Sequence, residues 1–113
     1  MIIQETISLD EVRALAEAMY GDMTKAVADV DKGLLAIDAE LHSDLETELL
    51  KEGSAQESLW GFNIYPEMYG DEDCIEYDSL INIRPRQGNR GRGVDNPEIR
   101  QKIVDIVNKH IIA

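Results

Sequence analysis

The sequence predicts an α+β protein with a mainly antiparallel sheet of about five strands, covered by three helices. Segments with an apolar residue at every second position alternate with segments in which apolar residues recur every three or four positions. Two pairs of strand-like segments are joined by short connections, and hairpins of this kind favour antiparallel pairing. The apolar content of 43% and charged content of 30% are those of a folded globular chain. The expected order is β-α-β-β-α-β-β-α.

The chain opens with a predicted strand and helix. Residues 1–7, MIIQETI, form a short strand, and Ser8 with Glu11 make a capping box at the start of a helix. The apolar positions of this helix fall on one face. Gly21 stands where a left-handed residue usually ends a helix.

A hairpin and a second helix follow. Residues 24–30 and 34–40 are two strands around Asp31-Lys32-Gly33, a loop with glycine at the position that needs a positive φ. Ser43 and Glu46 form a second capping box, which predicts a short helix that Gly53 ends.

The second half predicts another hairpin and a last helix. LWGFNIYP at 59–66 is a strand whose large apolar residues share one face, and IEYDSLINIRP at 75–85 alternates in the same way. Pro97 suits a first helical position. A continuous apolar stripe follows it: Ile99, Ile103, Ile106, Val107 and Ile111.

The length of 113 residues predicts a single domain, residues 1–113, with no room for a separate cofactor domain, so no cofactor is expected. No run approaches the roughly 20 apolar residues needed to cross a bilayer, and the first residues lack the features of a signal peptide. We therefore expect a cytoplasmic protein without a membrane partner. The lone Cys74 excludes an internal disulfide and a CxxC metal or redox pair, and no metal site is expected.

The charge distribution points to one local basic segment. The chain has 11 basic and 23 acidic residues, and four of the basic ones are arginines between positions 84 and 93, which contain no acid. A surface this acidic repels polyphosphate backbones, so nucleic acid is not an expected partner. It permits one focused anion site.

Three stretches also resemble a known family. AELHSDLE at 39–46, LWGFNIYP at 59–66 and INIRPRQGNRGRG at 81–93, which leads into the terminal Ile-rich helix, are similar to a family of short prokaryotic proteins classed only as a domain of unknown function. The resemblance spans most of the chain and implies a compact single-domain protein. It supplies no activity, ligand or catalytic residue.

The first candidate site is the arginine- and glycine-rich loop before the last helix. Arginine binds oxyanions with two parallel hydrogen bonds, glycine lets backbone N–H groups approach a ligand, and a helix N-terminus adds partial positive charge. The spacing matches neither nucleotide-binding fingerprint. The candidate ligand-binding residues are Arg84, Arg86, Asn89, Arg90 and Arg92.

Other roles for these arginines remain open. They can pair with acidic residues of the segment 71–78, or with a second subunit. A sheet with incompletely covered edges also favours a homo-oligomer. RNA binding is the weakest alternative, because no aromatic residues are interleaved with the arginines.

The second candidate site is Glu40, His42 and Asp44. In an extended segment these three side chains point to the same side and place a histidine between two carboxylates, which raises its affinity for a proton and suits general acid/base chemistry. The simpler interpretation is that Asp44 belongs to a helix cap and that His42 precedes it.

Three functions follow as hypotheses. The first is a binding module that holds a small phosphorylated or carboxylated ligand at the arginine loop. The alternative is a small phosphate-handling enzyme in which His42 transfers a proton, which requires the two candidate sites to meet. A third is an assembly domain that associates through the arginines.

Overall fold

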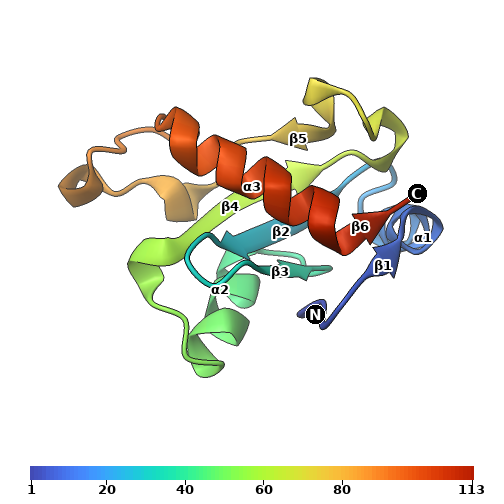
Figure 1. Cartoon of the computed structure of the whole chain (residues 1–113), viewed down its shortest axis with the longest axis horizontal. Helices are drawn as coiled ribbons and strands as arrows, with labels where there is room; N and C mark the ends of the chain where they lie inside the picture. The colour runs from blue at the N-terminus through green and yellow to red at the C-terminus, as the bar shows by residue number, and fades with distance from the viewer.

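A computed structural model describes residues 1–113, and a four-stranded antiparallel sheet lies at its centre (Figure 1). The strand order is β3-β2-β4-β5. The strands are β2 (Thr24–Asp29), β3 (Leu34–Ile37), β4 (Leu59–Ile64) and β5 (Ile75–Glu76). The predicted α+β class with three helices is confirmed, while the number and order of strands differ from the prediction.

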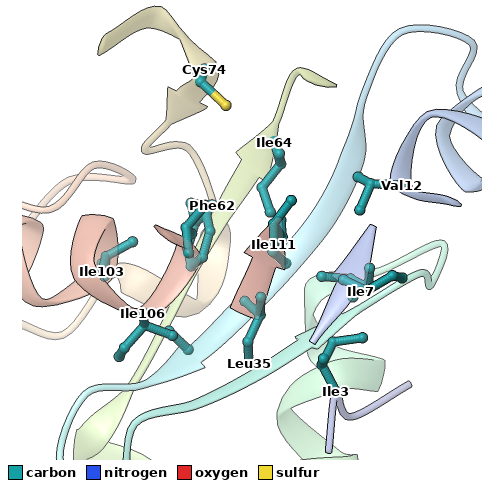
Figure 2. Close-up of a cluster of buried hydrophobic side chains, with 14 of the residues drawn as sticks. Ile3, Ile7, Val12, Leu35, Phe62, Ile64, Cys74, Ile103, Ile106 and Ile111 are labelled. Atoms are coloured by element: carbon teal, nitrogen blue, oxygen red, sulfur yellow. The ribbon is translucent and has the colours of Figure 1, made fainter. Parts of the chain in front are cut away.

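Both faces of the sheet are covered. The helices are α1 (Leu9–Met19), α2 (His42–Lys51) and α3 (Pro97–His110). Phe62 of β4 lies beside Ile103 and Ile106 of α3, and Ile64 of β4 points toward Ile111 (Figure 2). All five residues belong to the main buried cluster. The opposite face packs a smaller cluster against α2: Val27, Ala36, Leu45, Leu49 and Leu59.

Capping and turn residues in the sequence predicted the positions of several of these elements correctly. Ser8 Oγ accepts a hydrogen bond from Glu11 N at 3.1 Å, as the first capping box requires. Gly33 has a φ of 72°, which confirms the glycine position of the first hairpin. Asn96 caps α3 through Glu98 N and Ile99 N, and Pro97 begins the helix as predicted.

A parallel pair joins the two ends of the chain. β1 (Ile7–Ser8) pairs with β6 (Ile111–Ile112), so Ile111 lies in a strand and not in the last helix as predicted. His110 lies beside this pair, with Nδ1 2.7 Å from Glu5 O and Nε2 2.9 Å from Gly33 O. Residues before β1 run along β3 and form one isolated bridge, so the predicted strand at 1–7 was placed too early.

The predicted strand at 75–85 is wrong beyond its first two residues. Ser79 Oγ accepts a hydrogen bond from Ile81 N, and Leu80–Asn82 forms a single turn of 3-10 helix. Asn82 turns its side chain to β4, where it accepts from Gly61 N and donates to Gly61 O, both at 2.8 Å. Serine and asparagine can compete in this way with the ladder of a sheet. The side chain of Asn82 therefore occupies the place of a neighbouring strand.

Candidate functional site

A buried asparagine shapes the arginine-rich loop. Arg84 and Asn89 pair through their backbones, which closes a tight turn in which Gly88 has a φ of 78°. Asn89 Nδ2 donates to Asn82 O and Gly93 O at 2.8 Å and to Gly91 O at 3.2 Å, and Asn89 Oδ1 accepts from Asp95 N at 2.9 Å. Asn89 was predicted as an auxiliary ligand donor; the structure uses both ends of its amide to hold the loop.

Arg84 is engaged by the protein itself. Its guanidinium lies 4.8 Å from the ring centroid of Trp60 and donates to Ile81 O at 3.0 Å and to Leu59 O. Glu46 Oε2 lies 3.7 Å from Arg84 Nη2. Burial lowers the pKa of Arg84, and the charge of Glu46 partly offsets that effect. Arg84 thus anchors the base of the loop.

The other three arginines are exposed and diverge. Arg92 Nε donates to Asp78 Oδ1 at 2.6 Å, while Arg86 and Arg90 form no ion pair within the chain. Arg86 borders a hollow together with Arg84, and Arg92 borders a different one. The structure therefore does not bring the four arginines to a common point.

The second candidate site is also rearranged. Helix α2 begins at His42, after an extended Leu41, and no side chain caps it, so the predicted Ser43–Glu46 capping box is wrong. Once the chain turns helical, residues two apart no longer share a side. His42 is buried, whereas Glu40 and Asp44 are exposed, and the structure does not join the three side chains as predicted.

The environment of His42 lowers the proton affinity of its ring, whereas the two predicted carboxylate neighbours would have raised it. Its Nε2–H donates to Phe62 O at 2.8 Å. Burial lowers the pKa of His42 below the ordinary value of 6.5, and the charge of Lys25 acts in the same direction. Together they outweigh the Phe62 hydrogen bond, the nearby Asn63 side chain and the charge of Asp78, which raise the pKa. With Nε2 protonated, Nδ1 of the neutral ring has a lone pair.

His42 and Arg92, predicted at separate sites, border the same cavity of about 460 Å³. We call it the His42–Arg92 cavity. It lies between the N-terminus of α2, the nearby end of the sheet and the segment after β5. Its lining residues are Met23, Lys25, Leu41, His42, Ser43, Asn63, Glu76, Asp78, Ser79, Leu80, Ile81 and Arg92. Small-molecule sites commonly have volumes of about 300–1,000 Å³.

The sheet supplies a polar row to this cavity. Lys25 of β2 is paired with Asn63 of β4, and Asn63 with Glu76 of β5, so the three side chains stand next to one another on the α2 side of the sheet. Asn63 Nδ2 donates to Glu76 Oε1 at 2.8 Å. Asn63 Oδ1 is one of two buried side-chain polar atoms without a hydrogen-bond partner. Buried polar groups are normally paired, which marks this position as unusual.

Sequence reasoning missed Lys25, Asn63 and Glu76. The available signal was an asparagine inside the otherwise apolar strand LWGFNI. A polar residue at a buried strand position needs a partner or a function. Its neighbours could not be named without the register of strands that are far apart in the sequence.

Other cavities of similar size lie elsewhere on the surface. A cavity of about 540 Å³ lies between α3 and residues 69–77, beside the exposed carboxylates of Asp71, Glu72 and Asp73. Nowhere do three or more His, Cys, Asp or Glu side chains gather in a way that could hold a metal ion. None of the helices has the length and apolar content that a membrane crossing requires.

Replacement of His42 by glutamine is expected to remove one source of acid sensitivity. Because burial lowers the pKa of folded His42, the unfolded chain binds more protons as the pH falls below about 6.5, and the folded state loses stability there. The free energy of unfolding of the wild type should fall relative to His42→Gln between pH 7.5 and pH 5.5, as measured by urea titration. Parallel curves for the two proteins would show that His42 titrates as it does in the unfolded chain.

The fold and the cavity define a small α+β protein with one mixed-charge hollow beside an uncapped helix N-terminus. The chain belongs to the family described as protein of unknown function (DUF5674), whose model matches residues 1–110. No match was found among curated proteins, and none among solved structures.

Proposed function

We propose that the protein is a binding module for a small ligand with a carboxylate or a phosphate, held in the His42–Arg92 cavity. The observation that supports this proposal best is that Arg92, Lys25 and the uncapped N-terminus of α2 border one cavity of ligand size. Each of these groups favours an anion. The proposal keeps the anion-binding function expected for the arginine loop and moves it to Arg92, the loop arginine that borders this cavity.

Two cationic side chains at the cavity have hydrogen-bond donors available for a ligand. Lys25 Nζ lies 5.3 Å from the ring centroid of Tyr20 and forms no ion pair with a carboxylate. Arg92 uses Nε for Asp78, and neither of its Nη groups has a partner in the protein. A guanidinium has five N–H donors, so Arg92 can bind an oxyanion while it stays paired with Asp78.

The loop holds the backbone of Arg92 in place. Arg92 O accepts from Ser79 N at 3.0 Å and from Asn82 Nδ2 at 2.9 Å. Asn89 fixes the neighbouring residues through its bonds to Gly91 O and Gly93 O. A binding group that is already positioned loses less conformational entropy when the ligand arrives. In this proposal Arg84 and Asn89 therefore serve the site as positioning residues.

A second candidate function is proton transfer to or from the ligand by His42. One observation favours it: the ring is neutral because its pKa is lowered, and Nδ1 has a free lone pair beside the proposed anion site. Glu40 and Asp44 take no part in this version. If a bound compound is turned over, His42→Gln should abolish turnover without weakening binding to the same extent.

The proposal predicts selective stabilisation by ligands. In thermal unfolding with dicarboxylates, amino acids, phosphate, sugar phosphates and nucleotides, a compound at about one hundred times its dissociation constant should add roughly 2.7 kcal/mol to the wild type. That corresponds to a shift of several degrees for a chain of this size. Arg92→Gln should weaken the effective compound at least about tenfold, the cost of one lost charged hydrogen bond.

Arg90→Gln is the matched control, because Arg90 lies on the same loop but outside the cavity. It should bind as the wild type does. Equal losses in both variants, or no stabilising compound in the panel, would refute the proposal. Elution volumes in size-exclusion chromatography of the same proteins test the assembly alternative. That alternative predicts that the arginine variants change the oligomeric state and that no ligand changes the stability.

A further inference from the structure

The His42–Arg92 cavity is not a simple cationic pocket. Its lining contains two cations, Lys25 and Arg92, and two anions, Glu76 and Asp78, while burial keeps His42 neutral. The formal charges of the lining therefore cancel. A phosphate dianion would meet two carboxylates as well as two cations, and like charges at close range oppose binding.

The acceptors of the cavity lack donors, just as its cations have donors to spare. Asn63 Oδ1 is buried without a hydrogen-bond partner close to the His42 ring, whose Nδ1 has a lone pair in the neutral form. Glu76 uses Oε1 to accept from Asn63 Nδ2 and from Tyr65 OH, which leaves Oε2 free. Asp78 similarly binds Arg92 through Oδ1 and has Oδ2 free. A ligand that offered only an anion would leave all of these acceptors without a partner.

The donors and acceptors are ordered along the sheet. Lys25 stands on one side of Asn63 and Glu76 on the other, one strand spacing of about 4.7–4.9 Å at each step. The row thus passes from cation to neutral amide to anion. A ligand with separated negative and positive groups can match that order.

The rim of the cavity is apolar. Leu41 is 55% exposed and Leu80 is 67% exposed, the two highest values among the large apolar side chains of the protein. Both border the cavity, together with Met23 and Ile81. Apolar side chains at the mouth of a polar pocket gain free energy when a ligand's apolar part covers them.

We propose that the ligand is a small zwitterion, an amino acid with an apolar side chain. Its carboxylate binds Lys25, Arg92 and the N-terminus of α2. Its ammonium group lies toward Asn63, Glu76 and Asp78, and its side chain covers Leu41 and Leu80. This inference rests on the proposed function and narrows it to one ligand class.

Calorimetric titration of the wild-type protein with valine, leucine, isoleucine, methionine and phenylalanine tests it. The amino acid that binds best is then compared with its N-acetyl derivative, which lacks the ammonium charge, and with its amide, which lacks the carboxylate. Both blocked compounds should bind at least about tenfold more weakly. Inorganic phosphate, titrated in parallel, should bind more weakly than the amino acid.

Three variants test which residues bind the ammonium group and which bind the carboxylate. Glu76→Gln keeps an acceptor for Asn63 and Tyr65, and it should weaken the amino acid at least about tenfold while leaving the N-acetyl derivative unchanged. Arg92→Gln should weaken both compounds. Asp78→Asn repeats the first test at the other carboxylate, and thermal unfolding shows whether each variant is folded.

The outcomes separate this inference from the proposed function. If the N-acetyl derivative or phosphate binds as tightly as the amino acid, the cavity recognises an anion alone; the zwitterion inference then fails and the proposed function stands. If the amide alone binds, both fail. If none of the titrated compounds binds, the zwitterion inference fails, and the thermal-unfolding panel of dicarboxylates, sugar phosphates and nucleotides decides the proposed function. Binding that needs both charged groups and responds to Glu76→Gln supports both.

Discussion

Asn89→Ala is expected to lower the free energy of unfolding by about 3 kcal/mol or more. The side chain is buried, and its loss leaves Asn82 O, Gly91 O and Gly93 O without their donor and Asp95 N without its acceptor. An unpaired buried polar group costs about 1–3 kcal/mol. The four partners belong to one loop, so water can reach some of them when the loop opens locally. The total loss of stability is therefore smaller than the sum of four separate penalties.

Urea titration of Asn89→Ala, Asn89→Asp and Asn108→Ala tests this expectation. Asp keeps the shape and the acceptor for Asp95 N but turns a carboxylate toward three carbonyl oxygens, so it should cost at least as much as Ala. Asn108 is exposed on α3, and its replacement should change stability by no more than about 0.5 kcal/mol. Wild-type stability in Asn89→Asp would show that the donated bonds contribute nothing.

Local signals in the sequence predicted a large part of the fold. Neighbouring residues determine three features that the structure confirms: the turn around Gly33, the cap at Ser8 and the start of α3 at Pro97. The strand 59–64 follows from simple alternation. These elements need no information from distant parts of the chain.

The errors occurred where a distant partner decides the conformation. Ile111 continues the helical spacing of Ile103 and Val107, yet it pairs with Ile7 because that strand lies beside the end of α3. Residues 77–83 alternate like a strand, but Asn82 bonds Gly61 through its side chain. The spacing of apolar residues is the same in both cases. It cannot distinguish a residue whose backbone pairs with the next strand from a residue whose side chain takes over those hydrogen bonds.

The candidate residues were partly well chosen, but their grouping was not predicted correctly. His42 and Arg92 came from different predicted sites and border one cavity, while Arg84 and Asn89 bind the protein's own backbone. Glu40 failed to join His42 because α2 begins at His42. The cross-strand row from Lys25 to Glu76 depends on register, which only the folded sheet defines.

Gly61→Ala is expected to destabilise the protein by about 1–3 kcal/mol, the usual cost of inserting a methyl group into a packed interior. A Cβ at this position would lie 2.7 Å from Ser79 Cβ and Oγ and 3.1 Å from Ile81 Cγ1. The approach is close because Asn82 bonds both the N–H and the C=O of Gly61 and so holds the segment 79–82 against β4. The glycine is needed for space, since its φ is not positive.

A double-mutant cycle with Ser79→Gly separates the steric term from other effects. Ser79→Gly removes both atoms at 2.7 Å, so Gly61→Ala should cost less in that background by at least about 0.5 kcal/mol in urea titration. Ser79→Ala keeps Cβ and should give little relief, which makes it the control. Equal costs in all three backgrounds would mean that β4 and the segment 79–82 can separate freely. Because Ser79 and Ile81 also border the His42–Arg92 cavity, Gly61→Ala should also weaken any ligand that binds there, even where enough stability remains for folding.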